Sequence, residues 1–438
     1  MPRRTLSTLD AVAIVVGVVV GAGIFKTPAI VAGLAGNETA FLGIWVAGGA
    51  ASFVGALCYA ELASAFPDTG GEYHYLTRAF GQAPGFLFAW ARLSVIQSGS
   101  IAMLAFMLGD YLTEILPLGP YSSSLYAAAT IILLSVANML GIRQGSRMQL
   151  AFTSCIVLGL LSVIVMGLGL SQEAGAGGRG HASGETLGGA MVFVLLTYGG
   201  WNEAGYLSAE VRNPRRDMVR IMILSIGIIT AIYLLVNLAL LHGLGLAAMS
   251  RSEAVAADLA RTAMGENGAR FVSLIVAVTA LSTMNGSIIT GARSGHALGR
   301  DFPLLGFLGR WHRRADTPVN SLAVQGLASL LLVVVGTGSR SGFTMMVEYT
   351  APVFWFFLLL VGAALFALRL RDPGAERPFP VPLYPLTPLL FCGICLAMLA
   401  SSLAFTGAGA LLGMAVLASG LPLWLLNNHL KTKTRRTT

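Results

Sequence analysis

The sequence predicts an all-α polytopic membrane protein with 12 transmembrane helices. The mean hydropathy of the 438 residues is +0.75, 55% of them are apolar and only 11% are charged. A soluble protein of this length needs a polar shell around its core, and this composition cannot supply one. The apolar residues form long continuous runs near the roughly 20 residues that a helix needs to cross a bilayer. Alternating segments of about ten residues, which are typical of membrane barrels, are not the pattern here.

Twelve apolar runs account for most of the chain. They cover residues 10–34, 40–66, 84–114, 121–141, 147–171, 187–209, 218–243, 268–297, 318–336, 342–368, 384–405 and 407–428. We expect one transmembrane domain over 1–438, with a five-helix repeat at 10–171, a second at 187–368, two accessory helices at 384–428 and a basic tail at 429–438. The polar, turn-rich segment 67–83 predicts a short helix at the membrane interface.

The net charge of +8 is distributed in a way that favours a membrane topology over a nucleic-acid partner. Short basic clusters lie between alternate apolar runs, at Arg3–Arg4, Arg143/Arg147, Arg212–Arg220, Arg310–Arg314, Arg369–Arg377 and Lys431–Arg436. With the N-terminus inside, few basic residues fall in outer segments: Arg179, Arg251, Arg261, Arg270 and Arg340. Because cytoplasmic segments carry the excess of Lys and Arg, we expect both termini in the cytoplasm and membrane lipid around the helices.

The first span contains a break in its middle. Gly21-Ala22-Gly23 lies where an unpaired backbone group is most costly, and glycine weakens a helix. Unwound backbone at this depth is tolerated only where it lines a cavity or binds a ligand. The sequence therefore predicts a functional interruption of the first span.

The sixth span repeats this pattern. The glycine pair Gly199-Gly200 lies mid-membrane and is followed by the polar residues Asn202 and Glu203. Five spans separate the two breaks, and because five is odd, the two halves must have opposite orientations in the membrane. Paired breaks of this kind are typical of inverted repeats with a ligand site at their interface. The alternative is that these glycines are helix-packing contacts.

The two breaks offer complementary groups to a ligand. Free N–H groups at Gly21, Ala22 and Gly23 suit a carboxylate, whereas free carbonyl groups at Leu196, Thr197 and Gly199 suit an ammonium group. Together they match the zwitterionic backbone of an α-amino acid.

Other polar residues within the spans are candidate site residues. An ionisable group inside the membrane is a functional candidate by default, and Glu203 suits proton coupling or cation recognition, with a structural hydrogen bond as the alternative. Gln97 and Asn285 lie in mid-span, where they line the side-chain pocket or bond to a neighbouring helix. We place Asn202 in the same pocket.

Several function classes lack their motifs. There is no H-E-x-x-H, no paired intramembrane aspartates and no P-loop, so we expect neither an enzyme nor a primary pump. The four cysteines lie in apolar runs, including Cys392-x-x-Cys395, which favours packing over a disulfide scaffold or a metal site. We expect no cofactor and no metal.

Motifs in order along the chain carry a family resemblance. They are GAGIFKTP (Gly21–Pro28), YAELASAFPDTGGEYHYL (Tyr59–Leu76), YGGWNEAGYLSAEVRNPRR (Tyr198–Arg216), MNGSIITGAR (Met284–Arg293), LGRDFP followed by TPVNS, and RPFPVPLYP (Arg377–Pro385). With these motifs the chain resembles the amino acid–polyamine–organocation superfamily, and within it the bacterial relatives of the L-type amino acid transporters. The resemblance implies a LeuT-type fold, a 5+5 inverted repeat with broken helices 1 and 6 that works by alternating access.

Three departures from the family pattern qualify what the resemblance implies. Ile156 stands where sodium-independent members often have a lysine, and Gly291-Ala292 stand where sodium-coupled members have hydroxyl groups. Leu196 stands where members of the family often have a bulky aromatic gate, which implies either looser selectivity or gating by Tyr198 or Trp201. The loop Leu116–Ser122 lacks the cysteine that pairs with a glycoprotein, so no disulfide-linked subunit is expected.

From these observations we expect a neutral amino acid transporter of the bacterial inner membrane. Sodium-independent exchange or facilitated transport is the first hypothesis and proton symport through Glu203 the second. An amine or polyamine carrier is the third, although its pocket would need further acidic groups.

Overall fold

The computed structural model describes residues 6–68, 70–141, 146–170, 184–208, 211–312, 314–339, 341–405 and 407–437. In these residues the chain is helical, without a named β-strand, and has two isolated β-bridges that join Leu6 to Val211 and His312 to Thr317. The helices are α1 (Thr8–Val19), η1 (Ala22–Phe25), α2 (Thr27–Ala35), α3 (Glu38–Ala65), α4 (Glu72–Phe80), α5 (Gln82–Ala91), η2 (Arg92–Gln97), α6 (Ser98–Ile115), α7 (Ser122–Met139), α8 (Ser146–Gly169), α9 (Gly184–Thr197), η3 (Trp201–Glu203), α10 (Ala204–Leu207), α11 (Pro214–Leu244), α12 (Leu246–Met249), α13 (Val255–Asp301), η4 (Pro303–Leu305), α14 (Val319–Thr337), α15 (Gly342–Arg371), α16 (Leu386–Phe405), α17 (Ala408–Ala418) and α18 (Gly420–Thr437).

Within the described residues, nine helices are long and apolar enough to cross a membrane. They are Glu38–Ala65, Gln82–Ile115, Ser122–Met139, Arg216–Leu244, Val255–Asp301, Val319–Thr337, Gly342–Arg371, Leu386–Ala404 and Gly409–Asn427. The chain is therefore a multi-pass membrane protein. These nine match the predicted spans except the first, fifth and sixth. The first and sixth are each divided into shorter helices, and residues 171 and 209, which end the predicted fifth and sixth spans, lie outside the described residues.

The chain forms two compact units, each made from three separate stretches. Unit 1 comprises 1–82, 159–269 and 355–405, and unit 2 comprises 83–158, 270–354 and 406–438. The helices α5, α8, α13 and α15 contribute residues to both units.

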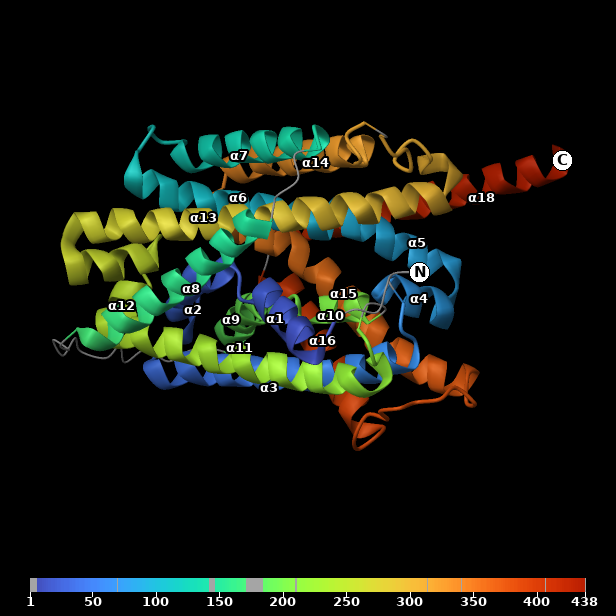
Figure 1. The fold of residues 1–438 in the computed structure, drawn as a ribbon, viewed down its shortest axis with the longest axis horizontal. Helices are drawn as coiled ribbons and strands as arrows, with labels where there is room; N and C mark the ends of the chain where they lie inside the picture. The colour runs from blue at the N-terminus through green and yellow to red at the C-terminus, as the bar shows by residue number, and fades with distance from the viewer. Residues whose placement is uncertain are drawn as a thin grey trace. The chain divides into compact units, whose positions relative to one another are not determined.

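In unit 1, α3 and α11 lie side by side along their length (Figure 1). Small residues on α3 allow this close approach, because a Cβ added to Gly49 would lie 2.7 Å from Thr230 Cγ2 on α11. The helices α1 and α2 pack against α11 and α9 respectively, and α16 covers both α3 and α9. These contacts form the frame that holds the two predicted breaks.

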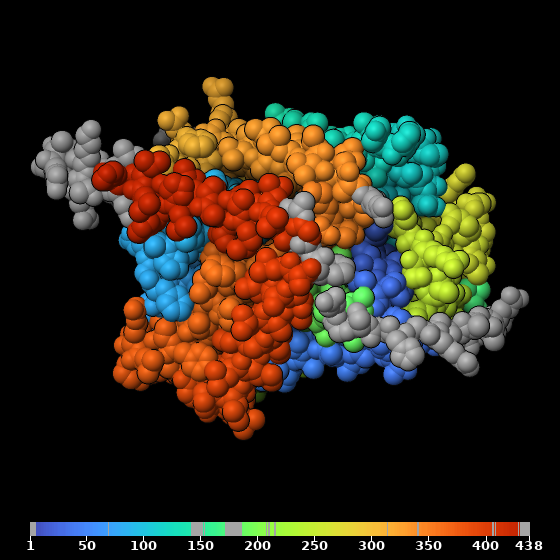
Figure 2. Space-filling model, turned by 180° about the vertical axis from the view of Figure 1, so that it is seen from behind, coloured from blue at the N-terminus to red at the C-terminus, as the bar shows by residue number. Residues whose placement is uncertain are grey.

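In unit 2, α7 packs against both α6 and α14. Figure 1 shows α7 beside α14, and the view from behind again shows these two helices adjoining, in teal and orange (Figure 2). Both helices expose large apolar side chains: Leu125, Ile132, Leu133 and Val136 on α7, and Leu327, Leu331, Val334 and Val335 on α14. A surface of this composition suits lipid, not water.

The helix predicted in 67–83 is present as α4, Glu72–Phe80, and its place at the membrane interface stays a prediction. Its buried residues Glu72, Tyr75, Leu76 and Ala79 recur at the i, i+3, i+4, i+7 spacing of one helix face. The segment before the eighth span is also helical, and it joins that span through Gly265, whose φ of 72° interrupts the helical conformation.

Candidate functional site

The first break lies between α1 and η1. Helix α1 ends at Val19, Val20 leaves the helical conformation (φ −75°, ψ 68°), and Gly21 is extended (φ −101°, ψ −161°). The Gly21 N–H donates to the Val19 carbonyl at 2.7 Å. The next N–H groups, of Ala22 and Gly23, begin a new helical turn and therefore have no acceptor inside that turn. Of the three predicted carboxylate-binding amides, Gly21 therefore has an acceptor within the break, and the other two have none inside the turn that they begin.

The second break follows α9. The Gly199 N–H donates to the Leu196 carbonyl at 3.0 Å, and Gly200 has a φ of +108°, which favours glycine. A Cβ on Gly199 would lie 2.8 Å from the Leu196 carbonyl oxygen, closer than such contacts occur. Both glycines are thus required by the backbone path, as expected for a functional interruption of the helix.

The hydroxyl group of Tyr233 on α11 connects the two breaks. It lies 2.8 Å from the Val19 carbonyl oxygen at the end of α1 and 2.9 Å from the Thr197 carbonyl oxygen at the end of α9. Tyr233 is fully buried between them. The two unwound segments therefore lie next to each other in unit 1.

A second contact joins the same segments. The Thr197 hydroxyl lies 2.7 Å from the Thr27 hydroxyl and 2.9 Å from the Phe193 carbonyl oxygen. Since each hydroxyl has one proton, the consistent arrangement is that Thr27 donates to Thr197 and Thr197 donates to Phe193. Gly23 lies against Thr197, since a Cβ added to it would lie 3.5 Å from the Thr197 methyl carbon. Gly23 and Leu196 are partly exposed although most of their neighbours are buried.

The two predicted gating aromatics pack against α3. Tyr198 donates to the Trp45 carbonyl at 3.1 Å, and its ring lies 4.9 Å from that of Tyr233. Trp201 packs edge-on against Tyr59 with ring centroids 5.0 Å apart. In this conformation both side chains are buried, so any gating by them requires that they leave these packed positions.

The two polar residues after the second break differ in their surroundings. Asn202 is buried, accepts from the Gly200 N–H at 3.2 Å and donates to Glu72 at 3.0 Å. Glu203 ends η3 with its side chain partly exposed, and its N–H donates to the Gly200 carbonyl at 3.0 Å. The Asn202 side chain thus stabilises the backbone of the break itself.

The remaining predicted pocket residues belong to unit 2. Asn285 on α13 accepts a hydrogen bond from Asn138 on α7 at 2.7 Å, which is the helix-to-helix alternative considered from the sequence. Gln97 is buried at the end of η2, a π-helical turn inside the third span. That turn leaves the Leu93 and Ser94 carbonyls to other donors, and they accept from the Ser98 and Tyr349 hydroxyls at 2.7 and 3.0 Å.

The family of this chain follows from its similarity to known proteins. The family model described as "Amino acid permease" matches residues 6–418. The chain belongs to the amino acid permease family. It is thereby a member of the amino acid–polyamine–organocation superfamily, as its motifs indicated.

Curated relatives match this permease over most of its length. The cystine/glutamate transporter of Homo sapiens is 29% identical over 97% of this chain and 85% of its own length. The b(0,+)-type amino acid transporter 1 of Homo sapiens is 29% identical over 87% of this chain and 79% of its own length. The serine/threonine exchanger SteT of Bacillus subtilis (strain 168) is 26% identical, with 96% of each chain covered. The family and these relatives are transporters and not enzymes.

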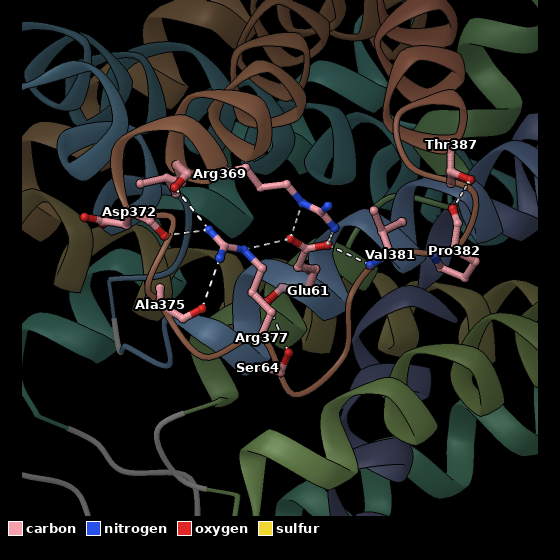
Figure 3. A network of polar contacts seen from close by, with 10 residues as sticks. Glu61, Ser64, Arg369, Asp372, Ala375, Arg377, Val381, Pro382 and Thr387 are labelled. Carbon is pink, nitrogen blue, oxygen red and sulfur yellow. Dashed lines mark hydrogen bonds and ion pairs between the residues drawn. The ribbon is translucent and has the colours of Figure 1, made fainter.

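The permease has an ion cluster in unit 1 that contains the motif residue Glu61. Arg369 donates to its carboxylate through two nitrogens at 2.8 and 2.6 Å, and the Val381 N–H donates at 2.7 Å (Figure 3). Arg377 Nε lies 3.4 Å from the same carboxylate, and the Arg369 guanidinium stacks on Tyr384 at 3.8 Å.

Two important residues were not identified from the sequence. Tyr233 is a polar side chain in the middle of the apolar seventh span, and this unusual position was the available signal. Glu72 lies in the quoted GGEYHY motif, where a buried carboxylate was not foreseen. Next to it, burial raises the pKa of the Tyr75 hydroxyl above its usual value, so this phenol stays protonated at physiological pH.

In the described residues, no group of three or more His, Cys, Asp or Glu side chains is arranged to hold a metal.

Proposed function

We propose that this permease is a secondary transporter that moves neutral amino acids across the membrane by alternating access, through sodium-independent exchange or facilitated transport. The N–H groups at the first break, Gly21 to Gly23, bind the substrate carboxylate. The carbonyl groups of Leu196, Thr197 and Gly199 at the second break bind the amine. Membership of the amino acid permease family supports the substrate class.

The observation that carries this proposal is the position of the Tyr233 hydroxyl between the two breaks. It brings the N–H groups of the first break and the carbonyl groups of the second break into one region, so one small molecule can use both. Tyr233 supplies one proton to carbonyl oxygens that have two lone pairs each. The Thr197 carbonyl therefore keeps acceptor capacity for an ammonium group.

The finer architecture belongs to the same proposal. We assign 12 transmembrane helices in a LeuT-type arrangement, with the two broken helices in corresponding places of inverted repeats. The basic clusters support cytoplasmic termini. We place the protein in a bacterial inner membrane, where it functions without a disulfide-linked glycoprotein subunit.

Uptake of radiolabelled amino acids into proteoliposomes tests the function. We expect uptake of neutral amino acids that is stimulated by internal unlabelled amino acid and is indifferent to sodium. Uptake driven by a proton gradient and lost in Glu203→Gln would instead assign proton symport. Folded protein that takes up no amino acid under any gradient would contradict the proposal and favour an amine substrate.

A matched pair of glycine variants connects the uptake to the break. Gly199→Leu places a side chain against the Leu196 carbonyl and should abolish uptake. Gly227→Leu lies on an exposed face of α11, where an added Cβ meets no atom within 4 Å, and should retain uptake. Equal activity of the two variants would remove the second break from the site.

A further inference from the structure

A buried carboxylate outside the transmembrane spans lies next to the second break. Glu72 is the first residue of α4, and its oxygens accept from three elements of unit 1. The donors are Tyr59 of α3 at 2.5 Å, Asn202 of η3 at 3.0 Å and Tyr206 of α10 at 3.3 Å. Burying a carboxylate is costly unless it is hydrogen-bonded, so the positions of these donors are coupled to that of Glu72.

The orientation of the Asn202 amide follows from its two partners. A carboxylate can only accept and a backbone N–H can only donate. The Asn202 amide nitrogen must therefore face Glu72, and its oxygen must face the Gly200 N–H at 3.2 Å. Through this one amide, Glu72 is connected to the residue that has the positive φ of the break.

The backbone conformation of the residue before Glu72 allows close contact with Tyr206. Gly71 has a φ of +48°, and a Cβ added there would lie 2.8 Å from the Tyr206 ring. The ring of Tyr206 thus lies against Gly71 while its hydroxyl donates to Glu72. The turn before α4 and the helix α10 after the break therefore contact each other through both packing and hydrogen bonds.

We propose that Glu72 is a positioning residue for transport, because it fixes the backbone of the second break through Asn202. This inference rests on the proposed function and adds a link between the break and the segment that holds α4. If the break rearranges when substrate binds or leaves, Asn202 must move against Glu72. Changes at this pair should therefore alter the rate of the transport cycle more than the affinity for substrate.

Exchanging the carboxylate and the amide between positions 72 and 202 tests the pairing of Glu72 with Asn202. In Asn202→Asp, two carboxylates face each other, and we expect the maximal uptake rate per folded protein to fall at least 10-fold with the KM changed less than threefold. This loss should diminish as the pH falls, because a proton shared by the two carboxylates restores the missing donor. The double variant Glu72→Gln/Asn202→Asp places a donor opposite an acceptor again and should recover uptake to within threefold of the wild type.

The control variant is Glu38→Gln, at an exposed glutamate of α3, which should transport as the wild type does. A double variant as poor as Asn202→Asp alone would contradict the pairing. A parallel fall in thermal stability and yield, with normal uptake per folded protein, would make Glu72 merely structural and would also overturn the proposal.

Hydrogen exchange separates this inference from the proposed function. Amide exchange in the peptide 197–204 should be at least 10-fold faster in Asn202→Asp than in the wild type and should slow again in the double variant. This measurement needs no substrate, so it tests whether Glu72 and Asn202 hold the break even if the wild type takes up no amino acid. Unchanged exchange in Asn202→Asp would show that the pair does not hold the break.

Discussion

The Tyr233 hydroxyl has one proton and two carbonyl acceptors, Val19 at 2.8 Å and Thr197 at 2.9 Å. The acceptors come from opposite breaks, and the tyrosine comes from a third helix. A hydroxyl so placed fixes the distance between two unwound segments that lack regular helical hydrogen bonds. We therefore consider Tyr233 the residue on which the geometry of the candidate site depends most.

Removal of this hydroxyl should reduce transport and leave the fold intact. Tyr233→Phe keeps the ring that packs between Trp45 and Tyr198 but leaves both carbonyls without this donor, at a cost of about 1–3 kcal/mol. We expect initial uptake per folded protein to fall about 10-fold. Tyr126→Phe is the control, because it removes a 2.8 Å bond to the Leu116 carbonyl at an exposed position. Equal uptake by the two variants would contradict this role.

Glu61 shows how burial determines the contribution of an ion pair to the stability of the fold. Its side chain is 3% exposed and it contacts Arg369, whereas Arg78 and Asp372 form a 2.9 Å pair at 45% and 35% exposure. Removing one partner of a buried pair costs about 3–5 kcal/mol. An exposed pair is worth about 0–1 kcal/mol.

We therefore expect Glu61→Ala to lower the thermal unfolding midpoint of the detergent-solubilised protein much more than Asp372→Ala does. In Glu61→Ala, the Arg369 and Arg377 guanidinium groups and the Val381 N–H lose a shared acceptor. Thermal unfolding monitored by fluorescence measures both variants in one experiment. Similar midpoints would mean that water reaches the Glu61 cluster and screens its charges.

At the scale of elements, each broken helix depends on glycines for a local reason. Gly200 has a φ of +108°, and a Cβ there would lie 3.3 Å from Val18 of α1. Gly227 in α11 is the opposite case, since it is helical and an added Cβ meets open space. The same residue type is thus required at one position and weakens a helix at the other.

The two substitutions should have opposite effects. Gly200→Ala strains the backbone by about 1–3 kcal/mol and should destroy most of the uptake. Gly227→Ala should leave uptake unchanged and stabilise the protein by about 0.5–1 kcal/mol, because glycine is unfavourable inside a helix. Unfolding midpoints and uptake rates measured side by side check both outcomes. Full uptake by Gly200→Ala would show that the break does not need its positive φ.

The sequence was informative about elements because their signals are local. Gly21 to Gly23 and Gly199-Gly200 stand out within a few residues of apolar sequence, and both breaks occur there. The partners of those segments are distant along the chain, since Val19 lies 214 residues from Tyr233. Similarly, Arg369, the partner of Glu61, lies 308 residues away and could not be identified without the fold.

At the scale of the whole molecule, composition was sufficient for the class and insufficient for the arrangement. Mean hydropathy and run lengths indicated a multi-pass membrane protein, and nine apolar helices among the described residues agree. The motif RPFPVPLYP indicated only a family resemblance. In the structure this motif has a local structural role, because its residues Arg377, Val381 and Tyr384 all contact the Glu61–Arg369 pair.

The central claim is that the two breaks bind the two charged ends of an amino acid. Competition against uptake of the best-transported neutral amino acid tests it most directly. The unlabelled amino acid should compete fully, whereas its methyl ester, which lacks the carboxylate, and its N-acetyl derivative, which lacks the ammonium group, should each compete at least 100-fold more weakly. Competition by either derivative as strong as that of the free amino acid would contradict recognition of that end by the unwound backbone.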